Sequence, residues 1–170
     1  MNFMAMMEIL NQATVIGFAA VLVWAAVQDL FTLRISNWTT LAVLALYPVY
    51  VLSAAQTVAL PAALVLGGLV FLVGFVLFHF KLFGGGDVKL LAAVALWAGA
   101  PLVVGFLLTV AVVGGVLAIV SMTPLRLLLP YMAAATRIKV DMARLMQLQI
   151  PYGVPIAAGG LFVAARLLHL

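Results

Sequence analysis

Two acidic side chains offer most of the chemistry available in a sequence that is otherwise very apolar. The chain has four carboxylate side chains, Glu8, Asp29, Asp87 and Asp141, and it has no cysteine. Asp141 stands among basic residues, which favours an ion-pair role, and Glu8 belongs to the far end of the first apolar segment. Asp29 and Asp87 remain. Two carboxyl groups placed close together cannot both ionise easily, so such a pair retains one proton. One group can then activate water while the other protonates an amide carbonyl.

The residues before Asp87 are three glycines, Gly84, Gly85 and Gly86. Without a Cβ atom they allow positive φ angles and the close approach of another backbone. A peptide substrate needs that room, because it must lie extended to expose its scissile bond. Glycine also interrupts helices, so Asp87 is expected at a helix N-terminus. The alternative interpretation is an ordinary loop between two spans, ended by an N-cap aspartate.

The elements that position these acids are expected to be membrane-spanning helices. Hydrophobic residues make up 68% of the chain and charged residues 7%, whereas a soluble domain is roughly 45–50% apolar and about 25% charged. The apolar runs are long and do not alternate, and only helices and closed barrels satisfy the backbone in lipid. We therefore expect one domain, residues 1–170, folded as an all-α polytopic membrane helical bundle. About six transmembrane helices are predicted, at Ile9–Gln28, Trp38–Leu52, Val58–Phe80, Val88–Ala100, Pro101–Val120 and Pro151–Leu168.

Basic residues predict the orientation of these spans. All of them except Arg166 fall on one side of the predicted membrane: Arg34, Lys81, Lys89, Arg126, Arg137, Lys139 and Arg144. The positive-inside rule makes that side cytoplasmic and both termini periplasmic, with the two acids on the cytoplasmic side. In a membrane protein, basic residues set the orientation and contact anionic lipid headgroups. The net charge of +4 is interpreted in this way, so no nucleic-acid partner is expected. The first apolar stretch carries Glu8 and no preceding basic residue, so a retained span is expected there rather than a cleaved signal peptide.

Two segments depart from simple spans. The fourth predicted span, from Asp87 to the turn at Gly99, is only about 21 Å long as a helix against ~30 Å of hydrocarbon. We expect Asp87 to sit below the membrane surface in a wet notch. Before the last span, apolar and charged residues recur in two stripes at helical spacing, which predicts an amphipathic helix lying in the cytoplasmic interface: Tyr131, Ala135, Ile138, Met142 and Leu145, and Arg137, Asp141 and Arg144. That helix either links two spans or helps to shape or gate a site.

Three segments resemble motifs of one family. GGGDVKLLAA, residues 84–93, resembles the GxGDVKLLA form of the GxGD motif in bacterial type IV prepilin peptidases, a group of membrane aspartic peptidases. DLFTLRISN, residues 29–37, is similar to their first-aspartate motif, although Ser36 stands where proline is more usual. PYGVPIAAG, residues 151–159, resembles a Pro-aromatic-Gly segment near their C-terminal span. The three motifs occur in the family's order, and the short chain looks most like the tight-adherence (Flp) pilus branch.

The resemblance implies an endopeptidase that cleaves the leader of Flp-type prepilins at the cytoplasmic face of the bacterial inner membrane. Asp29 and Asp87 would be its catalytic pair, with no metal and no organic cofactor. The prepilin, the lipid bilayer and the pilus-assembly machinery are the partners it implies. Longer family members carry a four-cysteine segment and also methylate the new N-terminus; because this chain has no cysteine, we expect peptidase activity without methylation.

Further residues are candidates for binding substrate or shaping the site. Arg34 and Asn37 either orient Asp29 or bind a prepilin acid, or they are ordinary helix-end residues. Lys89 either acts electrostatically on the acids or reaches lipid headgroups. Tyr152 and Gly153 begin the last predicted span and are expected near the same site. Two other functions stay open: a small proton-coupled transporter, because intramembrane carboxylates also serve that role, and a non-catalytic pilus-assembly subunit.

Overall fold

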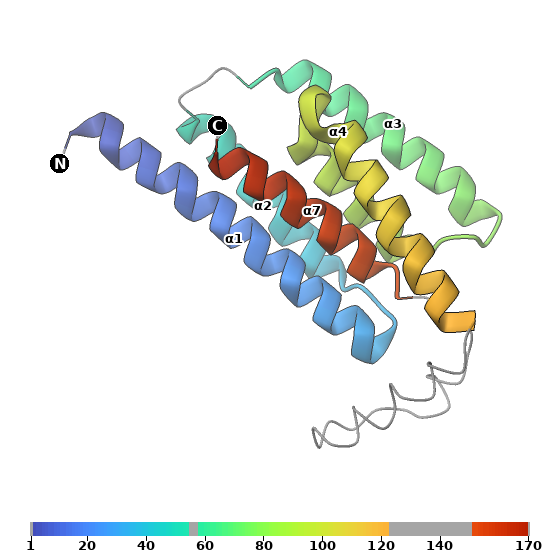
Figure 1. Ribbon diagram of the computed structural model, residues 1–170. Helices are drawn as coiled ribbons and strands as arrows, with labels where there is room; N and C mark the ends of the chain where they lie inside the picture. Colours follow the sequence, from blue (N-terminus) through green and yellow to red (C-terminus); the bar gives the residue numbers. More distant parts are fainter. Residues whose placement is uncertain (1, 55–57, 123–150, 170) are drawn as a thin grey trace, which may run out of the picture.

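The computed structural model is a bundle of helices (Figure 1) and describes residues 2–54, 58–122 and 151–169. Within those residues there are five helices and no strand. The helices are α1 (Phe3–Thr32), α2 (Asn37–Ser53), α3 (Leu60–His79), α4 (Gly85–Met122) and α7 (Gly153–Leu168). The all-helical prediction is therefore confirmed. The predicted interfacial helix falls on residues 123–150, which lie outside the described part.

Helix α4 contains a sharp reversal at Gly99. This residue has φ 54° and ψ −168°, which is not helical and divides α4 into two arms. Such angles belong to a region that is essentially restricted to glycine. The first arm packs along α3 and the second along α7, and Figure 1 shows the second arm returning toward the end from which the first departs. The predicted spans Val88–Ala100 and Pro101–Val120 thus correspond to the two arms of α4.

Three of the helices, α1, α3 and α4, are long and apolar enough to cross a membrane; α2 and α7 are apolar but shorter. Large apolar side chains cover their outer surfaces, and Val65, Val104 and Val112 are each about two-thirds exposed. Water would penalise such a surface, whereas lipid does not. The number of about six spans stays a prediction. Helix α1 extends beyond the predicted span Ile9–Gln28 at both ends, so Asp29 lies within the helix, one turn before its end.

An aromatic and aliphatic core holds the middle of the bundle together. The ring of Trp97, on the first arm of α4, stacks on Phe18 of α1 at 4.1 Å between ring centroids, with the planes 5° apart. Its indole Nε1–H donates to the carbonyl of Val43 on α2, at 3.0 Å. Gly160 of α7 lets that helix approach Leu22 on α1 closely. These contacts hold four helices together near the middle of their lengths: α1, α2, α4 and α7. They also determine how far each helix end extends along the bundle.

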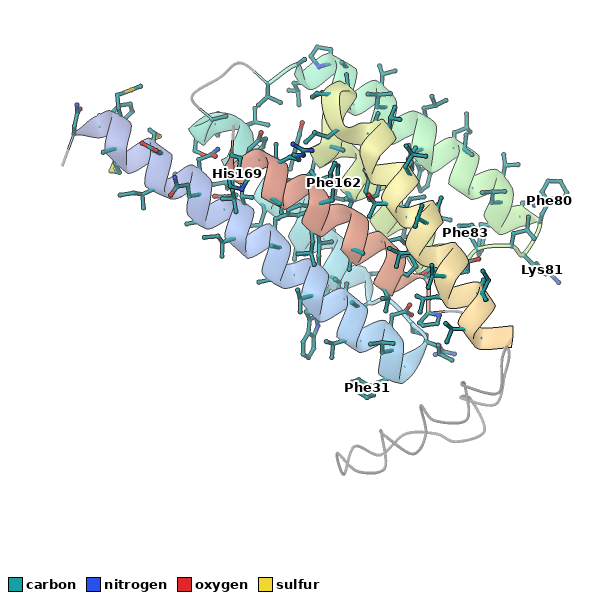
Figure 2. All side chains as sticks on the ribbon, in the orientation of Figure 1. Phe31, Phe80, Lys81, Phe83, Phe162 and His169 are labelled. Carbon is teal, nitrogen blue, oxygen red and sulfur yellow. The ribbon has the colours of Figure 1, made fainter. Side chains whose placement is uncertain are left out.

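The loops and helix ends that carry the candidate residues gather at one end of the bundle. Figure 2 shows Phe31, near the end of α1, and Lys81, after α3, toward that end, with His169 at the other. Arg34 lies between α1 and α2, and Lys89 lies in the first turns of α4. The described basic residues other than Arg166 therefore share one end of the bundle, as the positive-inside argument requires; the membrane orientation itself stays a prediction.

Candidate active site

Asp29 is held by the beginning of α7. Its side chain is 3% exposed, and its Oδ2 atom accepts a hydrogen bond from the backbone N–H of Gly153 at 2.6 Å. Gly153 is the first residue of α7, and the N–H groups at the start of a helix have no partner within the helix. The partial positive charge at that helix end also favours a carboxylate beside it. The last helix thus orients an acid that lies 124 residues earlier in the chain.

Asp87 is held by its own loop. Helix α4 begins at Gly85, so Asp87 lies in its first turn, as predicted. The Oδ2 atom accepts the backbone N–H of Gly84 at 3.1 Å. This is one half of a capping box, in which the side chain of the third helical residue reaches back to the backbone N–H before the helix. The carboxylate is partly exposed, in contrast to Asp29.

Contacts place the two carboxyl groups in the same region: Gly153, which binds Asp29, follows Tyr152, and the ring of Tyr152 contacts the ring of Phe83, four residues before Asp87. The two acids come from different helices, α1 and α4, and they meet at the same end of the bundle. Each uses Oδ2 to accept a glycine N–H, which leaves Oδ1 of each acid without a hydrogen-bond partner among the described residues. The site therefore presents two oriented carboxylates, each with one oxygen available to a water molecule or a substrate.

The turn between α1 and α2 supports the start of α4. Leu33 ends α1 in the left-handed conformation, at φ 51° and ψ 34°. The side-chain oxygen of Gln28 accepts the N–H of Ser36 at 3.3 Å and so ties the turn back to α1. A Cβ atom on Gly86 would lie 3.0 Å from the carbonyl oxygen of Ile35. The glycine thus allows the backbone of α4 to rest directly on this turn, beside the two acids.

The three glycines before Asp87 serve close approach and not unusual backbone angles. The positive φ angles that glycine permits do not occur at Gly84, Gly85 or Gly86; among the described glycines it is Gly99 that has a positive φ. Space excludes a side chain at two of the three positions: a Cβ on Gly84 would lie 2.6 Å from Oδ2 of Asp87, and one on Gly86 would lie 3.0 Å from the carbonyl oxygen of Ile35. A Cβ on Gly85 would make only an ordinary contact, 3.4 Å from the ring of Phe78. The close backbone approach predicted for this segment is present, and within the chain the backbone that approaches is that of Ile35.

The remaining predicted site residues differ in how they relate to the two acids. Tyr152 joins the site by stacking on Phe83 of the α3–α4 loop, with ring centroids 4.6 Å apart. Lys89 forms no ion pair with an acid of the described residues; its Nζ atom donates to Oδ1 of Asn37 at 3.1 Å and so joins α4 to α2. The side chain of Arg34 is exposed, and no hydrogen bond or ion pair joins it to Asp29 or to another described residue.

Sequence reasoning missed Gln28, Ile35 and Phe83. Phe83 lies directly before the glycines, and its aromatic character was a usable signal. The carbonyl of Ile35 carries no signal, because any residue has one. Within the described ranges, no three His, Asp or Glu side chains gather closely enough to hold a metal ion. The predicted absence of a metal cofactor stays a prediction.

The comparison with known families adds an independent observation to this geometry. Residues 16–119, more than half of the chain, match the model of the type IV leader peptidase family. The chain belongs to the type IV leader peptidase family. The matched range includes both aspartates, the α1–α2 turn and the three glycines, whereas Tyr152 and Gly153 lie outside it. No curated protein and no solved structure matches the chain. As a member of this family the protein is a prepilin peptidase, with helices apolar enough for a membrane.

Proposed function

We propose that the protein is an aspartic endopeptidase that removes the leader peptide of a type IV prepilin with Asp29 and Asp87. One observation carries the proposal: the two acids come from helices far apart in the chain and meet at one end of the bundle, each oriented by the N–H of a glycine. A family of leader peptidases supplies the reaction class, and family membership favours a peptidase over a proton-coupled transporter.

The mechanism follows from the two carboxyl groups. Because like charges at short range disfavour double ionisation, the pair retains one proton. The ionised group removes a proton from a water molecule, which attacks the carbonyl carbon of the scissile peptide bond. The protonated group donates its proton to the carbonyl oxygen, and a tetrahedral intermediate forms. Its collapse breaks the C–N bond and transfers a proton to the leaving amine. The Oδ1 atoms of the two acids, which accept no hydrogen bond from a described residue, are the positions for these transfers.

Finer features of the function are part of the same proposal. The motifs at residues 29–37, 84–93 and 151–159 support a prepilin as substrate, and we propose that it is of the Flp type. The absence of cysteine supports peptidase activity without N-methylation. The charges of Arg34, Lys81 and Lys89, at the end that bears the acids, support a cytoplasmic site in a bacterial inner membrane. Termini on the periplasmic side and about six spans complete the proposed topology, in which α2, α7 and both arms of α4 each cross the bilayer.

Co-expression with a prepilin tests the proposal. The prepilin carries a short basic leader that ends in glycine, and cleavage is followed by the shift in its mass. Asp29→Asn and Asp87→Asn should each lower the cleavage rate by a factor of about 10² to 10⁴ or more, because each removes one partner of the proton transfer. Glu8→Gln is the matched control: it removes an exposed carboxylate from the other end of α1 and should cleave at the wild-type rate.

Membrane levels of all three variants are compared by immunoblot, so that loss of protein is not read as loss of activity. Undiminished processing by either aspartate variant would refute the pair and favour a non-catalytic assembly subunit working beside another peptidase. A mass that corresponds to the methylated product would refute the absence of methylation.

A further inference from the structure

An open groove runs along the first arm of α4, between α2 and α3. Its volume is about 550 Å³, and most of its lining is apolar: Leu41 and Leu44 from α2, Leu64 and Phe71 from α3, and Ala92 and Leu96 from α4. Lys89 lines the groove, whereas Asp87 does not. Residues two apart on a helix face different sides. The groove and the two acids therefore lie on different sides of the same short helical arm.

The walls of the groove are exposed on the outside of the bundle. Leu41, Leu64 and Phe71 are 51%, 55% and 44% exposed. In a membrane these side chains face lipid, so a partner that is itself embedded in lipid reaches the groove by lateral movement, without crossing the headgroups. The apolar lining offers such a partner packing contacts along its length and hydrogen bonds only where polar residues occur.

The polar groups lie at one end of the groove, the end that is shared with the acids. Asn37 begins α2, Lys89 follows Asp87 by two residues, and their side chains are hydrogen bonded at 3.1 Å. Thr40 also lines this end; it is 7% exposed, and its buried hydroxyl has no hydrogen-bond partner in the part of the chain that the structure describes. A buried hydroxyl without a partner is costly, and most such groups are satisfied. Because that hydroxyl is shielded from solvent, the polar groups that the groove itself offers are the exposed side chains of Asn37 and Lys89, and these are a reason to expect a polar ligand here.

Gly68 supplies a second reason. Its neighbour Gly67 is explained by packing within the chain, because a Cβ there would touch the side chain of Leu96 at 3.4 Å. Gly68 lines the groove and is exposed, and a Cβ there would meet nothing within 4 Å. Small residues on the surface of a membrane helix allow a second helix to come close. Gly68 leaves room for the backbone of a helix that is not part of this fold.

We infer that the groove holds the apolar helix of the prepilin while its leader crosses to Asp29 and Asp87; this inference rests on the proposed function. The scissile segment must be extended, so its N–H and C=O groups lose their helical partners, and at membrane depth each needs a replacement. Asn37 and Lys89 provide hydrogen-bond donors where the substrate changes from helix to extended chain.

A pair of glycine variants tests the inference by kinetics. Gly68→Leu fills the groove, while Gly115→Leu is the matched control: Gly115 is also an exposed helical glycine with nothing within 4 Å, but it lies on the second arm of α4 and does not line the groove. With full-length prepilin in vesicles, Gly68→Leu should raise KM about tenfold or more with kcat retained, because overpacking opposes binding. Gly115→Leu should match the wild type. An unchanged KM for Gly68→Leu would overturn the inference.

Photocrosslinking provides a readout that does not depend on cleavage. A photoreactive amino acid replaces Phe71, which lines the groove, or its neighbour Leu72, which is exposed but does not, each in the Asp87→Asn protein co-expressed with prepilin. A crosslink to prepilin from position 71 and not from position 72 supports the inference. A crosslink to a second copy of the chain, or none to protein because lipid fills the groove, overturns it. Failure of the proposed function would instead appear as loss of cleavage by the wild type.

Discussion

Replacing Gly153 by alanine tests whether the start of α7 holds Asp29 in its catalytic position. A Cβ atom on Gly153 would lie 2.7 Å from Cβ of Asp29 and 2.9 Å from its Oδ2 atom. Unstrained contacts between carbon atoms are about 3.5–4.0 Å, so the two groups must separate by roughly 1 Å. A change of rotamer cannot relieve the contact, because Cβ of Asp29 is fixed to the α1 backbone. Either the start of α7 or the end of α1 has to move.

The size of the effect follows from that displacement. A misplacement of about 1 Å in a catalytic group costs on the order of 10²-fold in rate, or about 2.7 kcal/mol in the activation barrier. Alanine retains the backbone N–H that Asp29 accepts, so the variant changes the position of the hydrogen bond and not its presence. We expect kcat to fall about 100-fold, KM to change little, and the free energy of unfolding to fall by about 1–3 kcal/mol through overpacking.

Gly159→Ala separates the catalytic effect from the loss of stability. Gly159 is on the same helix, and a Cβ there would lie 2.8 Å from side-chain carbons of Phe106 and Val110, so the crowding is similar but is directed at apolar groups. Both variants are purified in detergent, their folded fractions are measured by thermal unfolding, and prepilin cleavage is followed per folded molecule. Gly159→Ala should lose comparable stability and keep kcat near the wild type. A Gly153→Ala enzyme with wild-type kcat, or with no greater loss than Gly159→Ala, would refute the reasoning.

Three further substitutions probe the packing that holds the site. Trp97→Phe removes the indole donor to the Val43 carbonyl and should lower the free energy of unfolding by about 1–3 kcal/mol, with cleavage per folded molecule unchanged; retained thermal stability would contradict this. Tyr47→Phe removes a buried hydroxyl that has no hydrogen-bond partner among the residues that the structure describes. It should raise the free energy of unfolding by about 1 kcal/mol, seen as a higher Tm, whereas a lower Tm would show that the hydroxyl is satisfied. Gly99→Ala should lower the free energy of unfolding by about 1–3 kcal/mol, because its φ of 54° and ψ of −168° are strained for a residue with a side chain. The Cβ itself would make only an ordinary contact with Pro101, at 3.6 Å, and an unaltered Tm would count against a requirement for glycine.

The apolar runs predicted the helices well, because a helix can be recognised from the residues of its own segment without knowing what packs against it. The predicted segments Trp38–Leu52 and Val58–Phe80 agree closely with α2 and α3. The placement of Asp29 and Asp87 at one end also follows from counting spans, since each crossing reverses the chain. The contact between Asp29 and Gly153 could not be derived in that way. It depends on α7 packing beside α1, and the lateral order of helices in a bundle leaves no signal in a single sequence.

Glycine shows why a correct motif can leave its structural explanation open. The sequence indicates that a position excludes a side chain, but it does not say whether backbone angles or neighbouring atoms are the cause. At Gly99 the cause is the backbone, with φ 54°. At Gly84 and Gly86 it is space, because a Cβ would meet Asp87 or the carbonyl of Ile35. Only the packing of α4 on the α1–α2 turn separates the two explanations.

The way the acids are held ties their spacing to the packing of three helices. Both Asp29 and Asp87 accept a backbone N–H, and a backbone donor has no rotamers through which it could adapt. The distance between the acids is therefore set by how α1, α4 and α7 pack, and a small shift of the first arm of α4 changes it directly. The substrate groove lies along that same arm, on the side where Lys89 meets Asn37. A helix that binds there contacts the element that carries Asp87, so we expect substrate binding to change the spacing of the acids.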